Sequence, residues 1–309
     1  MTAFRITQRT VAQTSLQGLQ GNLDRMQQLQ EQLSSGRSLN RPSDSPTRTV
    51  QAMQLRGDNA RTEQYARNAE DGLGWLATAD TVLTRSLDLV NRAREVTVAG
   101  MTDAIPPAAR EAMAIEIDNL RQGLLEVANT RYLNVPLFGG TTSGVAAYDP
   151  ATGTYVGDNG VLKRTVASGT AVEVSFTGPA VFGDDVDPTQ LFAVLDRISQ
   201  HLRTDADADG AVDPKVNMED LTTDLGDLDT AIDRMLSTLG QVGARFNRVE
   251  TLRDTADDKV LTGTSRLAET ESVDLAKTIV DLQLQEVAYQ AALGATARVI
   301  QPSLADFLR

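Results

Sequence analysis

Apolar residues near the start of the chain recur at alternating spacings of four and three. This is the pattern of a helix that buries one stripe against a partner helix. The stripe comprises Ala12, Leu16, Leu19, Leu23, Met26 and Leu33, and Gln30 alone interrupts it. We therefore expect an amphipathic helix over this segment.

The segment from Val273 to Ile300 carries two apolar stripes, whereas a helix hairpin needs only one. The first comprises Val273, Ala276, Val280, Leu284, Val287 and Ala291, and the second Ile279, Leu282, Tyr289, Leu293 and Ile300. A helix with two apolar faces is expected to bury the second face against another molecule, unless it is a core helix of a single bundle. The predicted assembly residues are Leu16, Leu19, Leu23, Met26, Leu33, Val280, Leu284, Val287, Leu293 and Ile300.

The interior of the chain repeats the same periodicity. Shorter stripes run from Leu76 to Val90, from Met113 to Val127 and from Leu191 to Leu202. The longest run comprises Leu221, Leu225, Leu228, Ile232, Met235, Leu239, Val242, Phe246 and Val249. These runs predict long helices packed side by side, since this spacing keeps one narrow apolar seam on a single face.

Residues 139–183 differ in composition from the helical segments: they contain small and β-branched residues and two turn signals, at 149–153 and 157–160. Strands are expected at 155–156, 161–166 and 171–176. The predicted fold is mainly α: an elongated antiparallel helical coiled-coil bundle with paired N- and C-terminal helices and a small inserted β-rich domain. The terminal assembly domain is expected to comprise 1–44 and 263–309, the helical rod domain 45–138 and 186–262, and the inserted β domain 139–185.

Breaker residues set the expected helix boundaries. The run 40–46 is too rich in proline, serine and aspartate to continue a helix, and Ser45 before Pro46 predicts the start of the next one. The helix that begins there is expected to loosen near Gly72 and Gly74. A second break is expected at residues 262–265, which read Thr-Gly-Thr-Ser.

Composition excludes several functional classes. The formal charge of -13 disfavours binding to nucleic acids or anionic membranes, which need clustered lysine and arginine. The chain has no cysteine, one histidine and 4% aromatic residues, so the usual parts of an active site or cofactor site are scarce. No apolar run reaches the about 20 residues that cross a bilayer, and the first ten residues lack the apolar stretch of a signal peptide. We expect no enzyme activity and no cofactor.

Two local features are weighed as chemical sites. Asp205, Asp207, Asp209 and Asp213 follow the spacing of a calcium loop, but Val216 stands where the bidentate carboxylate belongs, so a solvated acidic connection is the favoured interpretation. His201 has no carboxylate within reach on its own helix and is expected at the surface.

Residues 33–46, Leu-Ser-Ser-Gly-Arg-Ser-Leu-Asn-Arg-Pro-Ser-Asp-Ser-Pro, resemble the N-terminal signature of the bacterial flagellin superfamily. The version with Pro42 is more similar to the hook-filament junction branch, hook-associated protein 3, than to flagellin, although Ser45 replaces the usual second aspartate. Residues 132–141 and 301–308 resemble two further segments of that branch. The signature turn comprises Ser35, Gly36, Asn40, Pro42, Ser43 and Asp44.

The resemblance implies a secreted structural subunit of the bacterial flagellum, exported through the flagellar type III apparatus to the hook-filament junction. The implied partners are hook-associated protein 1, flagellin, further copies of the subunit and an export chaperone. A minor flagellin is the alternative within this class. A helical signalling coiled coil is the alternative from another class, although it would normally need a membrane span or a ligand pocket.

Overall fold

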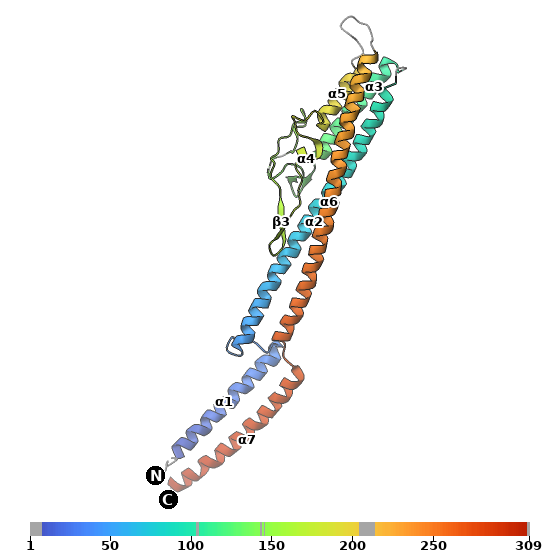
Figure 1. The fold of residues 1–309 in the computed structure, drawn as a ribbon. Helices are drawn as coiled ribbons and strands as arrows, with labels where there is room; N and C mark the ends of the chain where they lie inside the picture. Colours follow the sequence, from blue (N-terminus) through green and yellow to red (C-terminus); the bar gives the residue numbers. More distant parts are fainter. Residues whose placement is uncertain (1–7, 103–104, 143, 145, 204–213, 308–309) are drawn as a thin grey trace. The chain divides into compact units, whose positions relative to one another are not determined.

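The computed structural model describes residues 8–102, 105–142, 144, 146–203 and 214–307 (Figure 1). The helices are α1 (Gln8–Ser35), α2 (Pro46–Gly100), α3 (Pro107–Ala128), α4 (Gly178–Phe182), α5 (Leu191–Arg203), α6 (Pro214–Glu271) and α7 (Leu275–Phe307). The strands are β1 (Arg131–Tyr132), β2 (Val135–Pro136), β3 (Lys163–Ala167) and β4 (Thr170–Glu173). The predicted fold class is confirmed: the chain is mainly helical, its terminal helices pair, and short strands occupy an inserted region.

The chain divides into two compact units. Unit 1 comprises Met1–Arg61 and Lys259–Arg309, and unit 2 comprises Thr62–Asp258. The long helices α2 and α6 contribute residues to both units. Unit 1 is therefore built from the two ends of the chain, and unit 2 from its continuous middle.

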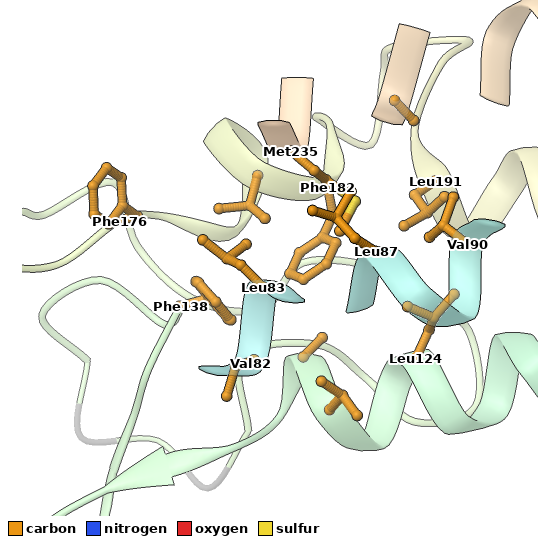
Figure 2. Close-up of a cluster of buried hydrophobic side chains, with 14 of the residues drawn as sticks. Val82, Leu83, Leu87, Val90, Leu124, Phe138, Phe176, Phe182, Leu191 and Met235 are labelled. Atoms are coloured by element: carbon orange, nitrogen blue, oxygen red, sulfur yellow. The ribbon is translucent and has the colours of Figure 1, made fainter. Parts of the chain in front are cut away.

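Unit 2 has a dense apolar core between α2, α3, α5 and α6. In the heptad run of α6, every second member from Leu221 to Val249 is fully buried and the others are half-buried, as the sequence predicts. Figure 2 shows part of this core, where Leu83 and Leu87 of α2 and Met235 of α6 converge with Phe182 of α4. Burial of large aliphatic and aromatic side chains is the main source of stability of such a unit.

The inserted region carries less strand than predicted. Within 139–185 only the antiparallel pair β3-β4 forms among the described residues, and a second two-stranded antiparallel sheet, β1-β2, directly precedes this region. Residues 155–156 form no strand, and Tyr155 makes only an isolated bridge to Tyr148. Helix α4, which the sequence did not predict, begins directly after Thr177 with Pro179 in its first turn, where a proline costs no hydrogen bond.

The inserted region docks on the long helices through charged and apolar contacts. Arg164 pairs with Asp71 of α2 at 2.6 Å, and the Arg245 guanidinium of α6 lies 4.4 Å from the centre of the Phe176 ring. Val172, Val174 and Phe176, expected on one face, are all buried. The region is therefore part of the core of unit 2.

One helix runs on as expected, and one expected helix break was wrong. Helix α2 continues through Gly72 and Gly74, where loosening was expected. These glycines admit close neighbours: a Cβ at Gly72 would lie 3.1 Å from Val174, and one at Gly74 would overlap the Tyr132 hydroxyl. Helix α6 likewise continues through residues 262–265 to Glu271, and a Cβ on Gly263 would overlap the side chain of Asn59 on α2. In both helices glycine serves helix packing, which outweighs its low helix propensity.

Candidate assembly interface

The seam between α1 and α7 contains many polar side chains. The least exposed residues of α7 follow a strict heptad: Thr278, Leu282, Gln285, Tyr289, Ala292 and Thr296. Those of α1 follow the matching order Ser15, Leu19, Asn22, Met26, Leu29 and Leu33. The Gln285 amide donates to the backbone oxygen of Asn22 at 3.2 Å and to its side-chain oxygen at 3.1 Å. Half of the seam positions are therefore polar or small.

The aliphatic side chains of α7 lie outside this seam. Val280, Leu284 and Val287 are 61%, 70% and 66% exposed. At 100° per residue these three lie on the side of α7 opposite the seam. Leu275, Ile279 and Leu293 form a second exposed strip that flanks the seam. Of the two stripes expected on this helix, the first, with Val280, Leu284 and Val287, is therefore accessible in the isolated chain, whereas the second places Leu282 and Tyr289 in the seam and leaves Ile279 and Leu293 exposed.

The α1 stripe is divided between seam and surface. Leu19, Met26 and Leu33 are half-buried in the seam, whereas Leu16 and Leu23 are exposed. The expected inward stripe was therefore rotated, because the polar Asn22 takes a seam position that the sequence reading gave to Leu23. The side chain of Ile300 lies outside the described part of the chain.

Unit 1 as a whole is polar inside and aliphatic outside. Among its described residues the fully buried side chains are Ala52, Thr270, Glu271, Thr278 and Gln285. Monomeric proteins rarely expose continuous apolar strips of this kind, and such strips mark contact sites with other molecules. The terminal helices are thus the candidate functional site.

The signature turn closes the end of α1. Gly36, which follows the last residue of the helix, has a φ of 69°, the left-handed conformation that commonly ends helices. The Asp44 carboxylate accepts hydrogen bonds from the backbone N–H of Asn40 at 3.0 Å and of Arg41 at 2.8 Å. Pro42 and Ser43 lie exposed between these partners. Gly36, Asn40 and Asp44 therefore shape the turn, and Ser35 accepts from the Arg37 N–H.

The turn is also bonded to the connection between α6 and α7. Val273 N–H donates to the Gly36 carbonyl at 3.2 Å, and Ser38 N–H donates to the Glu271 carbonyl at 2.7 Å. The Glu271 carboxylate, nearly buried, pairs with Arg56 at 2.7 Å. These contacts, which we call the joint, hold both connections of unit 1 together. Sequence periodicity does not reveal Arg56 or Glu271, because their pairing joins residues more than two hundred positions apart.

The remaining candidates are His201 and the acidic run from Asp205 to Asp213. The expectation for His201 was wrong: it is half-buried, and its Nδ1 lies 2.6 Å from the Asp224 carboxylate of α6, which also pairs with Arg197 at 2.9 Å. Asp205, Asp207, Asp209 and Asp213 lie outside the described residues. Within the described ranges no group of three metal-ligating side chains is found, and no helix could span a membrane.

The first part of the chain matches a known family model. The bacterial flagellin N-terminal helical region matches residues 6–142, a range that includes α1, the signature turn and α2. Full-length relatives from the same group extend the match to the rest of the chain. The chain belongs to the flagellin superfamily.

Several superfamily members are similar over nearly the whole chain. Flagellar hook-associated protein 3 of Escherichia coli (strain K12) is 25% identical, covering 94% of this chain and 96% of the relative. Flagellar hook-associated protein 3 of Salmonella typhimurium is 23% identical, covering 94% of this chain and 95% of the relative. The flagellin of Bacillus subtilis (strain 168) is 24% identical, covering 96% and 97%.

Solved structures show the same fold. A putative flagellar hook-associated protein from Vibrio parahaemolyticus superposes with a TM-score of 0.65 at 18% identity, covering 74% of this chain and all (100%) of that one. The flagellar junction protein from Legionella pneumophila superposes with a TM-score of 0.57 at 15% identity, covering 72% of this chain and 99% of that one. These relationships confirm the prediction of a non-enzymatic structural flagellar subunit of the hook-associated protein 3 kind.

Proposed function

We propose that this subunit forms part of the hook-filament junction and connects the hook, through hook-associated protein 1, to the flagellin filament. Support comes from the full-length similarity to hook-associated protein 3, the signature turn with Pro42, and the absence of a reactive site in the described residues. Export through the flagellar type III apparatus with a chaperone, and a final extracellular location, complete the proposal. The chain has no cysteine that could cross-link during export.

The exposed aliphatic strips of the terminal helices carry this proposal. Full burial of a leucine or valine side chain stabilises by about 1.5–3 kcal/mol, so covering Val280, Leu284 and Val287 with neighbouring subunits yields several kcal/mol. In the proposed assembly, α1 and α7 stay paired through their seam and form the inner layer. Neighbours above and below then cover the outer strips, which explains why the aliphatic residues lie away from the seam.

The substitution Leu284→Asp tests the proposal. A carboxylate in a covered layer costs several kcal/mol when it has no partner, whereas at a position that is 70% exposed in the monomer it costs little. We expect the purified variant to keep its melting temperature. Cells carrying it should complete hooks and export flagellin, but lose the flagellin to the medium.

The matched control is Leu133→Asp, which changes a leucine that is 74% exposed in unit 2. Its backbone φ of 48° suits aspartate at least as well as leucine. This variant should support normal filaments. Normal filaments with Leu284→Asp would contradict the proposed role of the terminal helices.

The similarity to the flagellin of Bacillus subtilis supports a second candidate function, that of a minor flagellin. The two functions differ in self-assembly. A flagellin polymerises into long filaments on its own, whereas a junction subunit requires its partners. Electron microscopy of the concentrated purified protein should therefore show no long filaments.

A further inference from the structure

One layer of the α1·α7 seam pairs two amides across the helices. Gln285, 8% exposed, donates from its Nε2 atom to the backbone and side-chain oxygens of Asn22. The seam residues on either side of this layer are apolar: Leu19 and Met26 on α1, and Leu282 and Tyr289 on α7. The amide layer is therefore a polar step within an otherwise apolar part of the seam.

This layer is a poor choice for stability alone. A buried amide gives up its hydration, and each hydrogen bond that replaces it stabilises by only about 0.5–1.5 kcal/mol net, whereas each leucine fully buried at these positions would stabilise by about 1.5–3 kcal/mol. Buried polar residues at single seam positions of coiled coils instead specify the register of the helices, at a cost in stability.

The apolar layers do not define the register by themselves. The Gln285–Asn22 bonds and the antiparallel course of α1 and α7 (Figure 1) place Met26 level with Leu282, and Leu19 level with Tyr289. If α7 slipped by one heptad, Met26 would meet Tyr289 and Leu33 would meet Leu282, which are equally acceptable apolar layers. Among these seam layers the amide layer discriminates, because Gln285 would then face Leu29 and leave a buried amide without a partner.

A slip would also displace the proposed assembly surface. Seven residues of helix correspond to about 10 Å, so the outer strip of α7 would move by that distance relative to Leu16 and Leu23 of α1. Neighbouring subunits would then meet a mismatched surface. The joint favours the observed register at the adjacent helix ends, since Val273 N–H bonds to the Gly36 carbonyl just before α7 begins, and the amide layer holds the same register farther along the seam.

We propose that Asn22 and Gln285 form the register-setting pair of the terminal helices. The pair permits only the alignment in which the outer aliphatic strips of α1 and α7 are level. The physiological purpose rests on the proposed function in assembly, whereas the register itself is a property of the isolated chain.

Disulfide trapping tests the register directly, because the chain contains no cysteine. One reporter carries Met26→Cys and Leu282→Cys and reports the observed register. A second carries Met26→Cys and Tyr289→Cys and reports the slipped register. Each is made with and without Asn22→Leu and Gln285→Leu, oxidised as a dilute monomer, and the intramolecular cross-linked fraction is measured.

With Asn22 and Gln285 present, only the first reporter should cross-link efficiently. With both leucines, the ratio of slipped to observed cross-link should rise by about 5- to 150-fold, the change that corresponds to one unpaired buried amide. An unchanged ratio would overturn the proposal, as would failure of the first reporter to cross-link in the parent chain. Folding is checked by circular dichroism, and the double leucine variant should be at least as helical as its parent.

The matched control is Thr278→Leu, which also replaces a buried polar seam residue. Its hydroxyl bonds to the Asp274 carbonyl of its own helix and not to α1, so this change should leave the cross-link ratio unaltered. The assay needs no flagellum, so its outcome is independent of the Leu284→Asp test. Normal filaments with Leu284→Asp would remove the assembly role and leave the register pair intact.

Discussion

The two units of this subunit place their apolar residues in opposite ways. Unit 2 buries leucine, valine, isoleucine and phenylalanine between four helices and carries charged pairs such as Arg94–Asp229 outside. Unit 1 buries Gln285, Thr278 and Glu271 and exposes Leu284 and Val280. Both units are made of heptad helices, so the periodicity alone does not show which face is covered within the chain. The difference supports the proposal that other subunits complete unit 1, whereas unit 2 already covers its apolar core within the chain.

The largest expected difference concerns local opening. Terminal helices with a half-polar seam and uncovered aliphatic strips gain less from burial to set against the cost of ordering, about 1–2 kcal/mol per backbone residue, so they should stay paired but open locally far more often than unit 2. We expect amide hydrogen exchange at residues 16–26 and 282–293 of the dilute monomer to be at least about a thousandfold faster than in the unit 2 stretches 82–96 and 228–249. Equal protection in both regions would mean that unit 1 does not need neighbours.

Truncation of aromatic and aliphatic side chains should give the next largest difference. Phe182→Ala should lower the free energy of unfolding by about 3–5 kcal/mol, because Phe182 is fully buried in unit 2 and its truncation leaves a cavity. Leu284→Ala should cost less than about 0.5 kcal/mol in the monomer, as surface changes usually do. Urea unfolding of both variants measures the two values. A loss above about 1 kcal/mol for Leu284→Ala would show that this side chain is already covered.

Two tyrosines of unit 2 allow a comparison between a core hydroxyl group that forms hydrogen bonds and one that does not. Tyr155 donates to the Phe138 carbonyl at 3.1 Å and to the Asp158 carbonyl at 2.6 Å, and burial raises its pKa to about 12. Tyr155→Phe should therefore cost about 1–3 kcal/mol. The fully buried Tyr148 hydroxyl has no hydrogen-bond partner among the described residues, so Tyr148→Phe should be neutral or stabilising. Thermal unfolding should rank the two variants in this order.

The smallest expected effect concerns pH. The Asp158 carboxylate accepts bonds from the Thr141 hydroxyl and N–H, both at 2.6 Å, and from the Gly160 N–H at 2.9 Å, which lower its pKa. Because the pKa is lower in the folded state, the carboxylate contributes stability above the unfolded value of about 3.9. That contribution is lost as the pH falls through the folded pKa.

Asp158→Asn should therefore lower the free energy of unfolding at pH 7. It should also make the loss of stability below about pH 4 less steep than in the parent protein. Urea unfolding at several pH values compares the variant with its parent. A parallel decline in both proteins would show that Asp158 is not responsible.

The sequence predicted the features that depend on short-range periodicity. The heptad run of α6, the two apolar faces of α7 and the pairing of the chain ends all follow from residues three or four positions apart. The seam face of α1 was misjudged because only apolar residues were expected between α1 and α7. In the structure the polar Asn22 lies in the seam and Leu23 lies outside it. Glycines such as Gly263 read as breaks, since their packing partner Asn59 is distant in the chain. The Arg56–Glu271 and His201–Asp224 pairs were missed because the members of each pair lie on different helices, beyond the reach of local periodicity.

The pairing of residue 22 with residue 285 joins segments that lie on either side of unit 2 in the chain. Helix α1 precedes unit 2 and its seam partner α7 follows it, so α1 has no seam partner until the whole of unit 2 has been synthesised. A polypeptide that stopped between Asp258 and Leu275 would contain all of unit 2, but it would offer α1 no partner and neighbours no outer strip. In the proposed assembly, such truncated products would be excluded from a growing structure without any separate proofreading factor.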